Sequence, residues 1–370
     1  MTQVSSLYLH VPFCQHLCNY CDFYKRKFTH PTEQIEGFHQ LLESEWRRHE
    51  ILMLEQNFSW GPLETLYLGG GTPSLWGTAG AEFLKTKILS HVPLQSNAEF
   101  TMEIDPGTWN QELVSAWKDI GLNRISIGTQ TLNPEFLKIM DRIHSKDDSL
   151  SLLSFCRKNN WNFSLDFLLG LPFSQTKKRS ILEELDEFLS YEPKHLSLYI
   201  LNARSKYPHA QNMPEDGFIR DEYLAVSEYL RSHGFHHYEV SNFALPGYES
   251  KHNLKYWNSE SVAALGPTGS GLLVQNDERA LRYKWKVSEG EAEFEQLGKE
   301  ELSLEKVYLK LRTSEGWAPQ NITPEHTALF EKWTSKNLGF WDGKIMVLNS
   351  QGYVILDSLM NELFSCKIEL

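Results

Sequence analysis

The sequence predicts an α/β fold, a partial (β/α)6 TIM-like barrel followed by a small C-terminal α+β winged-helix-like domain. Two observations predict it. Short apolar segments rich in β-branched residues alternate six times with amphipathic segments of helical period. The alternation stops after about residue 285, where short helical segments surround a hairpin signal. We therefore expect two domains, residues 1–285 and residues 286–370.

The strands and helices of the barrel follow from the apolar periodicity. The first long helix, for example, carries Ile35, Phe38, Leu42 and Trp46 on one face. Six units are too few to close an eight-unit barrel, so we expect an open one. The expected strands cover residues 7–11, 63–68, 98–104, 123–128, 163–169 and 195–201, and the helices cover 32–56, 78–90, 110–119, 134–140, 146–159, 177–190 and 218–233.

The C-terminal segment has a different pattern. Helices are expected over 305–311, 324–337 and 358–364. Residues 345–348 and 353–356 read as two strands on either side of Asn349-Ser350-Gln351-Gly352, a sequence typical of a hairpin turn. Winged-helix domains often bind DNA, but this one lacks a stripe of Lys and Arg, so we expect it to pack against the barrel.

The composition excludes several classes of protein. The formal net charge of −12 argues against a broad nucleic-acid surface. No apolar run approaches the roughly 18 residues that a membrane span needs, and the first residues do not resemble a signal peptide. Clustered free cysteines indicate a reducing compartment. We expect a cytoplasmic protein with no nucleic-acid partner and at most peripheral membrane association.

Three of the five cysteines are spaced C-x3-C-x2-C directly after the first strand, at Cys14, Cys18 and Cys21. Thiolates are soft ligands that suit iron–sulfur clusters or zinc. Three thiolates can bind three irons of one cubane and leave the fourth iron open to another ligand. The spacing therefore favours a 4Fe-4S cluster with an open iron.

The main alternative is structural zinc, which needs a fourth protein ligand. His10 and His16 are the nearest candidates, and no second Cys/His pair follows at ligand spacing. A disulfide framework is disfavoured by the odd number of cysteines. The isolated Cys156 and Cys366 are interpreted as small buried hydrophobic residues.

Unusual residues also follow the other expected strands. Glycines 69–71 follow the second strand, Glu103 ends the third, Gln130 follows the fourth and Asp166 lies in the fifth. Because chemistry in such barrels gathers at the carboxyl ends of the strands, these residues are expected to share one rim with the cysteines. The glycines allow a polar ligand to approach the backbone closely.

These segments resemble a known family. The sequence Tyr8-Leu-His-Val-Pro-Phe-Cys14-x3-Cys18-x-Tyr-Cys21 resembles the radical S-adenosylmethionine (SAM) superfamily. Four further segments narrow the resemblance to the oxygen-independent coproporphyrinogen III oxidase group. They are GGGTPS at 69–74, EIDPG at 103–107, NRISIGTQ at 123–130 and DFLLGLP at 166–172.

The resemblance implies a cluster whose open iron binds SAM and an electron donor that reduces it. By motif, Tyr8, Gly70 and Glu103 are expected to contact this SAM. A second SAM site in the group is matched by Gly71, Thr72, Gln130, Arg142 and Asp166, and Tyr20 matches an aromatic residue of the cysteine loop.

A later segment resembles the haem chaperones of the HemW type. His252-Asn-Leu-Lys-Tyr256-Trp257 matches their H-N-x-x-Y-W motif. The match implies haem as cargo, with the imidazole of His252 offered to iron and the rings of Tyr256 and Trp257 offered to the porphyrin. Few residues precede Cys14, so the segment that the decarboxylase carries there is expected to be missing.

Three functions follow as hypotheses. The first is a cytoplasmic radical-SAM-type haem chaperone that delivers haem to acceptor haemoproteins. The alternative is an enzyme, an oxygen-independent coproporphyrinogen III oxidase that uses SAM for oxidative decarboxylation in porphyrin biosynthesis. The third is a zinc-binding or redox-sensing regulator that uses the winged domain.

Overall fold

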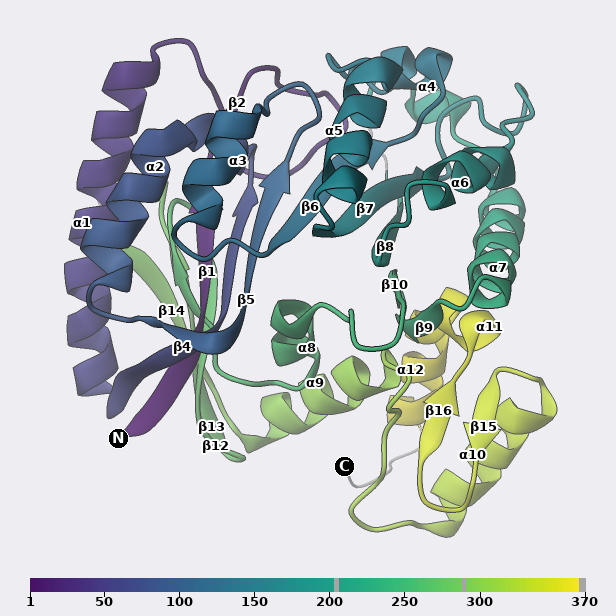
Figure 1. The fold of residues 1–370 in the computed structure, drawn as a ribbon. Coiled ribbons are helices and arrows are strands. Elements are labelled where there is room, and N and C mark those ends of the chain that lie inside the picture. The colour runs from purple at the N-terminus through teal and green to yellow at the C-terminus, as the bar shows by residue number, and fades with distance from the viewer. Residues whose placement is uncertain (203–205, 288–290, 366–370) are drawn as a thin grey trace.

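The computed structural model describes residues 1–202, 206–287 and 291–365. A nine-stranded sheet in the order β11-β1-β4-β5-β6-β7-β8-β10-β9 forms its centre (Figure 1). The six strands from β1 to β8 in this order are parallel, which confirms the predicted α/β class. They are β1 (Thr2–Val11), β4 (Phe58–Gly70), β5 (Leu94–Ile104), β6 (Arg124–Gln130), β7 (Asn162–Leu169) and β8 (His195–Ile200).

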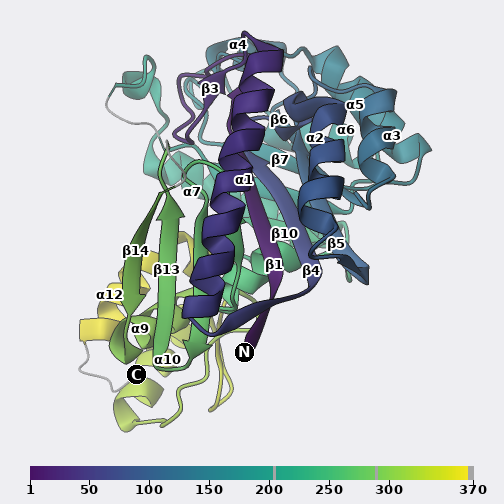
Figure 2. The ribbon, with the colours of Figure 1, turned by 90° about the vertical axis from the view of Figure 1, so that its left-hand side faces the viewer.

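Helices cover the outer side of the sheet (Figures 1 and 2). The longest, α1, buries Phe38, Leu42 and Trp46, the face that the apolar period predicts. Asn110 caps α3 by accepting a hydrogen bond from the backbone N–H of Leu113. The helices are α1 (Pro31–Glu55), α2 (Gly77–Phe83), α3 (Gln111–Lys118), α4 (Pro134–Ile139), α5 (Lys146–Lys158), α6 (Ile181–Leu189) and α7 (Asp216–Ser232), with a π-helical turn at Leu84–Leu89 and 3-10 turns at Pro73–Trp76 and Ala210–Asn212.

The isolated Cys156 lies in α5 with no exposed surface, and burial raises the pKa of its thiol to about 12. The prediction that it is a small buried hydrophobic residue agrees with this environment. Cys366 lies outside the described residues.

Short strands extend both edges of the sheet. β11 (Ala263–Leu265) pairs with β1 in parallel, and β10 (Asn242–Ala244) and β9 (His236–Glu239) continue antiparallel from β8. A separate antiparallel sheet contains β12 (Ser270–Asn276), β13 (Arg279–Trp285) and β14 (Ala292–Leu297). This sheet runs across residue 285, so the domain boundary given above stays a prediction.

The C-terminal part combines helices with a hairpin, as predicted, but the hairpin lies elsewhere. β16 (Met346–Leu348) pairs with the preceding β15 (Gly339–Trp341), and residues 350–354 are helical. Asn349 is the N-cap of that helix, because its side chain accepts hydrogen bonds from the backbone N–H groups of Gln351 and Gly352. The helices are α9 (Lys299–Leu311), α10 (Pro324–Ser335), α11 (Ser350–Val354) and α12 (Leu356–Ser365).

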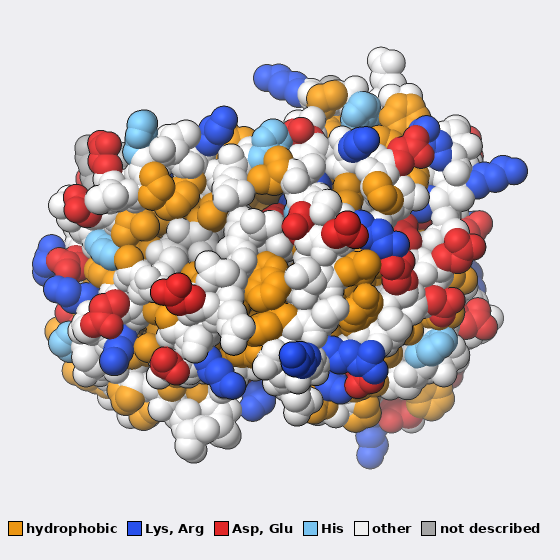
Figure 3. Space-filling view, turned by 45° about the horizontal axis from the view of Figure 1, so that its top comes forward, with side chains coloured by type: hydrophobic (Ala, Val, Ile, Leu, Met, Phe, Trp, Pro, Cys, Tyr) orange, Lys and Arg blue, Asp and Glu red, His pale blue; other side chains and the backbone are white. Residues whose placement is uncertain are grey.

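The face of the molecule shown in Figure 3 carries no simple charge pattern. On the face that Figure 3 shows, Lys and Arg side chains are interspersed with Asp and Glu, and hydrophobic side chains gather near the centre. This face therefore has no continuous basic stripe for a nucleic-acid backbone. None of the described helices is long and apolar enough to cross a bilayer.

Candidate cofactor site

Two short strands hold the cysteine loop. β2 (Phe13–Cys14) and β3 (Arg26–Lys27) pair in parallel at its two ends. Inside the loop, the Lys25 ammonium donates to the carbonyl oxygens of Cys18 at 3.0 Å and Cys21 at 2.5 Å. Burial raises the pKa of the Cys14 thiol to about 11 and also raises that of Cys18. All three cysteines line one cavity, together with residues 70–72.

The glycines after β4 allow the strand end to approach this loop. The N–H of Gly71 donates to the carbonyl of Val11 at 2.8 Å, and a Cβ on Gly71 would lie 2.6 Å from the carbonyl oxygen of Phe13. Gly70 has a φ of 112°, and a Cβ there would overlap the His10 ring. The glycines thus let two backbone segments meet, and both also line the cavity wall.

A second cavity of about 410 Å³ adjoins the first and shares Tyr20, Cys21, Asp105, Arg142 and residues 70–72 with it. It adds the polar side chains of Glu103, Gln130 and Asp166. Eight of the nine residues that the sequence predicts for SAM therefore line one of two adjoining cavities. The ninth, Tyr8, donates or accepts a 3.2 Å hydrogen bond with His10 and packs near the ring of Tyr67.

Two buried carboxyl groups give this cavity its electrostatic character. Glu103 accepts hydrogen bonds from the Tyr67 hydroxyl at 3.0 Å and from the Gly70 N–H at 3.1 Å. Burial, reinforced by the nearby charge of Asp166, raises the pKa of Glu103 to about 7. Burial also raises the pKa of Asp166 to about 6, although Ser126 donates to it at 3.2 Å. Both groups therefore change charge close to neutral pH.

This pKa shift predicts a pH dependence that Glu103→Gln removes. The folded pKa of Glu103 lies above its ordinary value of 4.5, so the folded state holds a proton that the unfolded state releases. The proton bound to Glu103 stabilises the folded wild type at low pH, and this stabilisation is lost as the pH rises from about 4.5 to about 7. Both proteins are unfolded in urea at pH 4.5 and at pH 7.5. The free energy of unfolding of the variant, relative to that of the wild type, should be higher at pH 7.5 than at pH 4.5. An equal change in both proteins would contradict the assignment.

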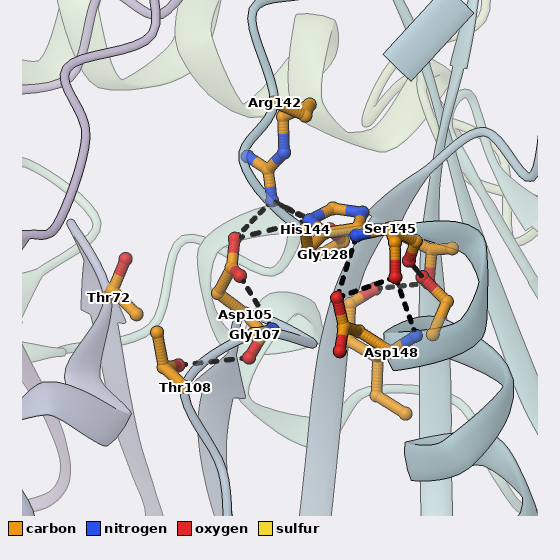
Figure 4. Close-up of polar contacts among 12 residues, drawn as sticks. Thr72, Asp105, Gly107, Thr108, Gly128, Arg142, His144, Ser145 and Asp148 are labelled. Carbon is orange, nitrogen blue, oxygen red and sulfur yellow. Dashed lines mark hydrogen bonds and ion pairs between the residues drawn. The ribbon is translucent and has the colours of Figure 1, made fainter. Parts of the chain in front are cut away.

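Arg142 lies beside Asp105 and His144 (Figure 4) and joins the cysteine loop to two strand ends. Its guanidinium pairs with the carboxylate of Asp105 after β5, donates to the Gly128 carbonyl of β6 at 3.0 Å and donates to the Tyr20 hydroxyl at 3.2 Å. Burial alone would raise the pKa of Asp105, but Arg142 and His144 lower it to about 2. The Arg142 Nε atom is buried and has no hydrogen-bond partner among the described residues.

Asp105 and His144 are not among the site residues predicted from the sequence. The Nδ1 atom of His144 lies 3.2 Å from the Arg142 guanidinium and 3.6 Å from Asp105 (Figure 4). The position of Asp105, at the end of a strand and before Pro106-Gly107, was the available signal. His144 has no comparable signal because it reaches the site through the loop between α4 and α5.

The residues predicted for haem lie on α8 (Lys251–Trp257) and line neither cavity, although His252 lies behind Tyr67, a residue of the second cavity's wall. His252 is 1% exposed, and its ring stacks on Tyr67 with 5.2 Å between centroids. Its Nδ1 lies 2.8 Å from the Thr65 hydroxyl and its Nε2 lies 3.4 Å from the Tyr256 hydroxyl. Burial lowers the pKa of His252 to about 3, which keeps the ring neutral.

Trp257, the third residue of this set, faces the C-terminal part of the chain. The Arg312 guanidinium lies over its ring, 4.5 Å from the centroid. Arg312 also lies 3.5 Å from the buried carboxylate of Glu239. The structure thus brings His252 and Tyr256 together inside the barrel, whereas Trp257 packs against Arg312.

Comparison with known proteins shows the class to which this chain belongs. A model of the radical SAM superfamily matches residues 8–183, the segment that carries the cysteine loop and all the lining residues of the two cavities except Tyr199. The solved structure of coproporphyrinogen III oxidase (HemN) from Escherichia coli, a radical SAM enzyme, superposes with a TM-score of 0.80 at 17% identity and covers 97% of this chain and 89% of that chain. Fold, cysteine loop and cavities together define a radical SAM protein, a class whose cofactors are a 4Fe-4S cluster and SAM.

Relatives place the chain within that class. The chain is 32% identical over 346 residues to the heme chaperone HemW of Lactococcus lactis, across 89% of this chain and 86% of the relative. It is 30% identical over 284 residues to HemW of Escherichia coli, across 75% of this chain and 72% of the relative. The chain belongs to the HemW family of haem chaperones.

Proposed function

We propose that this chain is a haem chaperone that holds a 4Fe-4S cluster, SAM and haem and delivers haem to acceptor haemoproteins. The observation that carries the proposal is the likeness to HemW chaperones along most of the chain. The chain is only 17% identical to HemN, and this similarity supports a shared fold alone. The oxidase alternative therefore has no separate support.

The cysteine cavity suits a cluster better than a single zinc ion. All three cysteines line one cavity, and each candidate fourth ligand for zinc already lies close to another polar group. The His10 Nε2 atom lies 2.9 Å from the Tyr24 carbonyl, and the His16 Nε2 atom lies 2.8 Å from Asp141. A cluster held by Cys14, Cys18 and Cys21 would supply one electron to SAM once an electron-donor protein has reduced it.

The adjoining cavity offers groups that suit SAM. Glu103, Gln130 and Asp166 provide acceptors for ribose hydroxyls and the amino group, and the buried Arg142 Nε provides an unpaired donor for a carboxylate. Residues 70–72 and Tyr20 belong to the lining of both cavities. Tyr8 lies outside the lining, and we propose that it supports Glu103 through Tyr67.

Haem ligation by His252 requires α8 to move. In the present conformation both ring nitrogens have partners, and backbone N–H groups of α8 are held by Glu99 at 3.0 and 3.2 Å. We propose that haem loading releases His252 from Thr65, so that its neutral Nε2 or Nδ1 can bind iron and Tyr256 and Trp257 can contact the porphyrin.

The function is tested by titrating the reconstituted protein with haem and then adding an apo-haemoprotein. We expect saturable binding followed by transfer of haem, and no decarboxylation of coproporphyrinogen III with SAM and reductant. His252→Ala should alter the Soret band, because an iron ligand is lost. Thr65→Val removes the same buried hydrogen bond but keeps the imidazole, so it should retain the wild-type spectrum.

Two results would contradict parts of this proposal. Absence of saturable haem binding by the wild type would remove the chaperone function. A His252→Ala spectrum identical to that of Thr65→Val would remove His252 as a ligand and leave α8 with a purely structural role.

A further inference from the structure

One cation in the wall of the cysteine cavity, Lys25, leaves the backbone at a point that strand pairing fixes. Lys25 lines the cavity and comes directly before β3. The N–H of Arg26 donates to the Pro12 carbonyl at 2.6 Å, and the N–H of Phe28 donates to the Cys14 carbonyl at 2.8 Å. The side chain of Lys25 therefore enters the cavity from a defined position.

The Lys25 ammonium holds the turn between the last two cysteines. An ammonium has three N–H donors, and Lys25 gives two of them to the carbonyls of Cys18 at 3.0 Å and Cys21 at 2.5 Å. The Cys18 carbonyl also accepts from the Cys21 N–H at 3.4 Å. No acceptor for the third ammonium donor is found within the described residues. Lys25 thus fixes the loop and keeps one donor for an occupant of the cavity.

Lys25 also gives the cavity a positive charge that its wall does not balance. Among the described residues of the lining, Asp105 is the one carboxylate, and it pairs with Arg142. The ion pairs found between described residues do not include Lys25. Burial raises the pKa of the Cys14 thiol, whereas the charge of Lys25 acts to lower it. The ammonium therefore favours negative charge on groups held in this cavity.

We propose that Lys25 is a positioning residue for the 4Fe-4S cluster and raises its reduction potential, an inference that rests on the cluster of the proposed function. The ammonium folds the loop that carries Cys18 and Cys21 and places its charge beside the three thiolates. Reduction adds one electron, and so one negative charge, to the cluster. A nearby cation lowers the energy of the reduced, more negative form. The electron comes from the electron-donor protein, or from dithionite in the test.

The test is a dithionite titration of the reconstituted full chain, followed by electron paramagnetic resonance. Lys25→Gln keeps an amide donor for the loop carbonyls but removes the charge. Its midpoint potential should be more negative than that of the wild type, and at a fixed solution potential its ratio of reduced to oxidised cluster should fall roughly tenfold. Lys25→Arg keeps a cation with N–H donors and should restore the wild-type potential. Lys27→Gln, at an exposed lysine outside the cavity lining, should behave as wild type.

Iron and sulfide per chain are measured in every variant, because the loop may lose its cluster when Lys25 is replaced. A loss in Lys25→Gln that Lys25→Arg restores supports the folding of the loop by the cation. A wild-type potential in Lys25→Gln would overturn the inference, and so would a loss of cluster that Lys25→Arg does not restore or an equal shift of potential in Lys27→Gln. A wild type that assembles no cluster would instead overturn the cluster of the proposed function, and this inference with it.

Discussion

Cys18→Ser is expected to abolish the cluster. Serine offers a hard, weakly acidic hydroxyl in place of a soft thiolate, and among the described residues three thiols line the cysteine cavity. After anaerobic reconstitution, wild type should carry about four irons and four sulfides per chain, and the variant well under one of each. Iron, labile sulfide and the absorbance of the cluster measure this directly. The same loss is expected for Cys14→Ser and Cys21→Ser.

Cys156→Ala is the matched control for the cysteine variants. Cys156 is a fully buried thiol of α5, away from the cavity, so its replacement should leave iron and sulfide unchanged. Full cluster content in Cys18→Ser would contradict the assignment of the ligands. Zinc without sulfide in the wild type would instead favour the zinc hypothesis.

Arg142→Ala is expected to be the most destabilising single change at the site. The Arg142 and Asp105 side chains are 11% and 14% exposed, so removal of the arginine leaves a buried carboxylate without its cation. Breaking such a pair costs about 3–5 kcal/mol. The change also frees Tyr20 from its contact with the guanidinium. Chemical unfolding should show the loss of stability, and reconstitution should give a lower cluster content.

Arg157→Ala provides the comparison on the surface. Arg157 pairs with Glu192 at 2.7 Å, but these side chains are 53% and 61% exposed. Such pairs contribute about 1 kcal/mol or less. Equal stability of the Arg142→Ala and Arg157→Ala proteins would contradict the role of Arg142 as the connection between the cysteine loop and the strand ends.

The barrel was predictable because its strands are long apolar runs separated by amphipathic helices. The shift from a period of two to a period of 3.6 fixes both the type and the order of these elements. The strands β9 to β14 were not predicted. For β9 to β11 the reason is their length, since a three-residue strand such as Ala263–Leu265 has no periodicity of its own and depends on pairing with β1. Asn349 was misread because asparagine suits both a hairpin turn and a helix N-cap.

The site was predictable where residues sit at strand ends. The carboxyl ends of parallel strands lie at one rim of the barrel. For this reason Cys14, Gly70, Glu103 and Asp166 line two adjoining cavities. The contacts of Arg142 with Tyr20 and Asp105 were not predictable, since they join residues far apart in sequence. The burial of the His252 side chain was not predictable either. The pattern of α8 does not indicate that its imidazole lies beneath Tyr67 and bonds to Thr65.

The central claim is that three cysteines hold a cluster whose open iron faces the SAM cavity. Electron paramagnetic resonance of the reduced, reconstituted protein, recorded with and without SAM, tests this claim most directly. The account predicts the signal of a reduced 4Fe-4S cluster that changes when SAM is added, because SAM binds the open iron. A cluster signal that stays identical with SAM, or a protein that assembles no cluster, would contradict it.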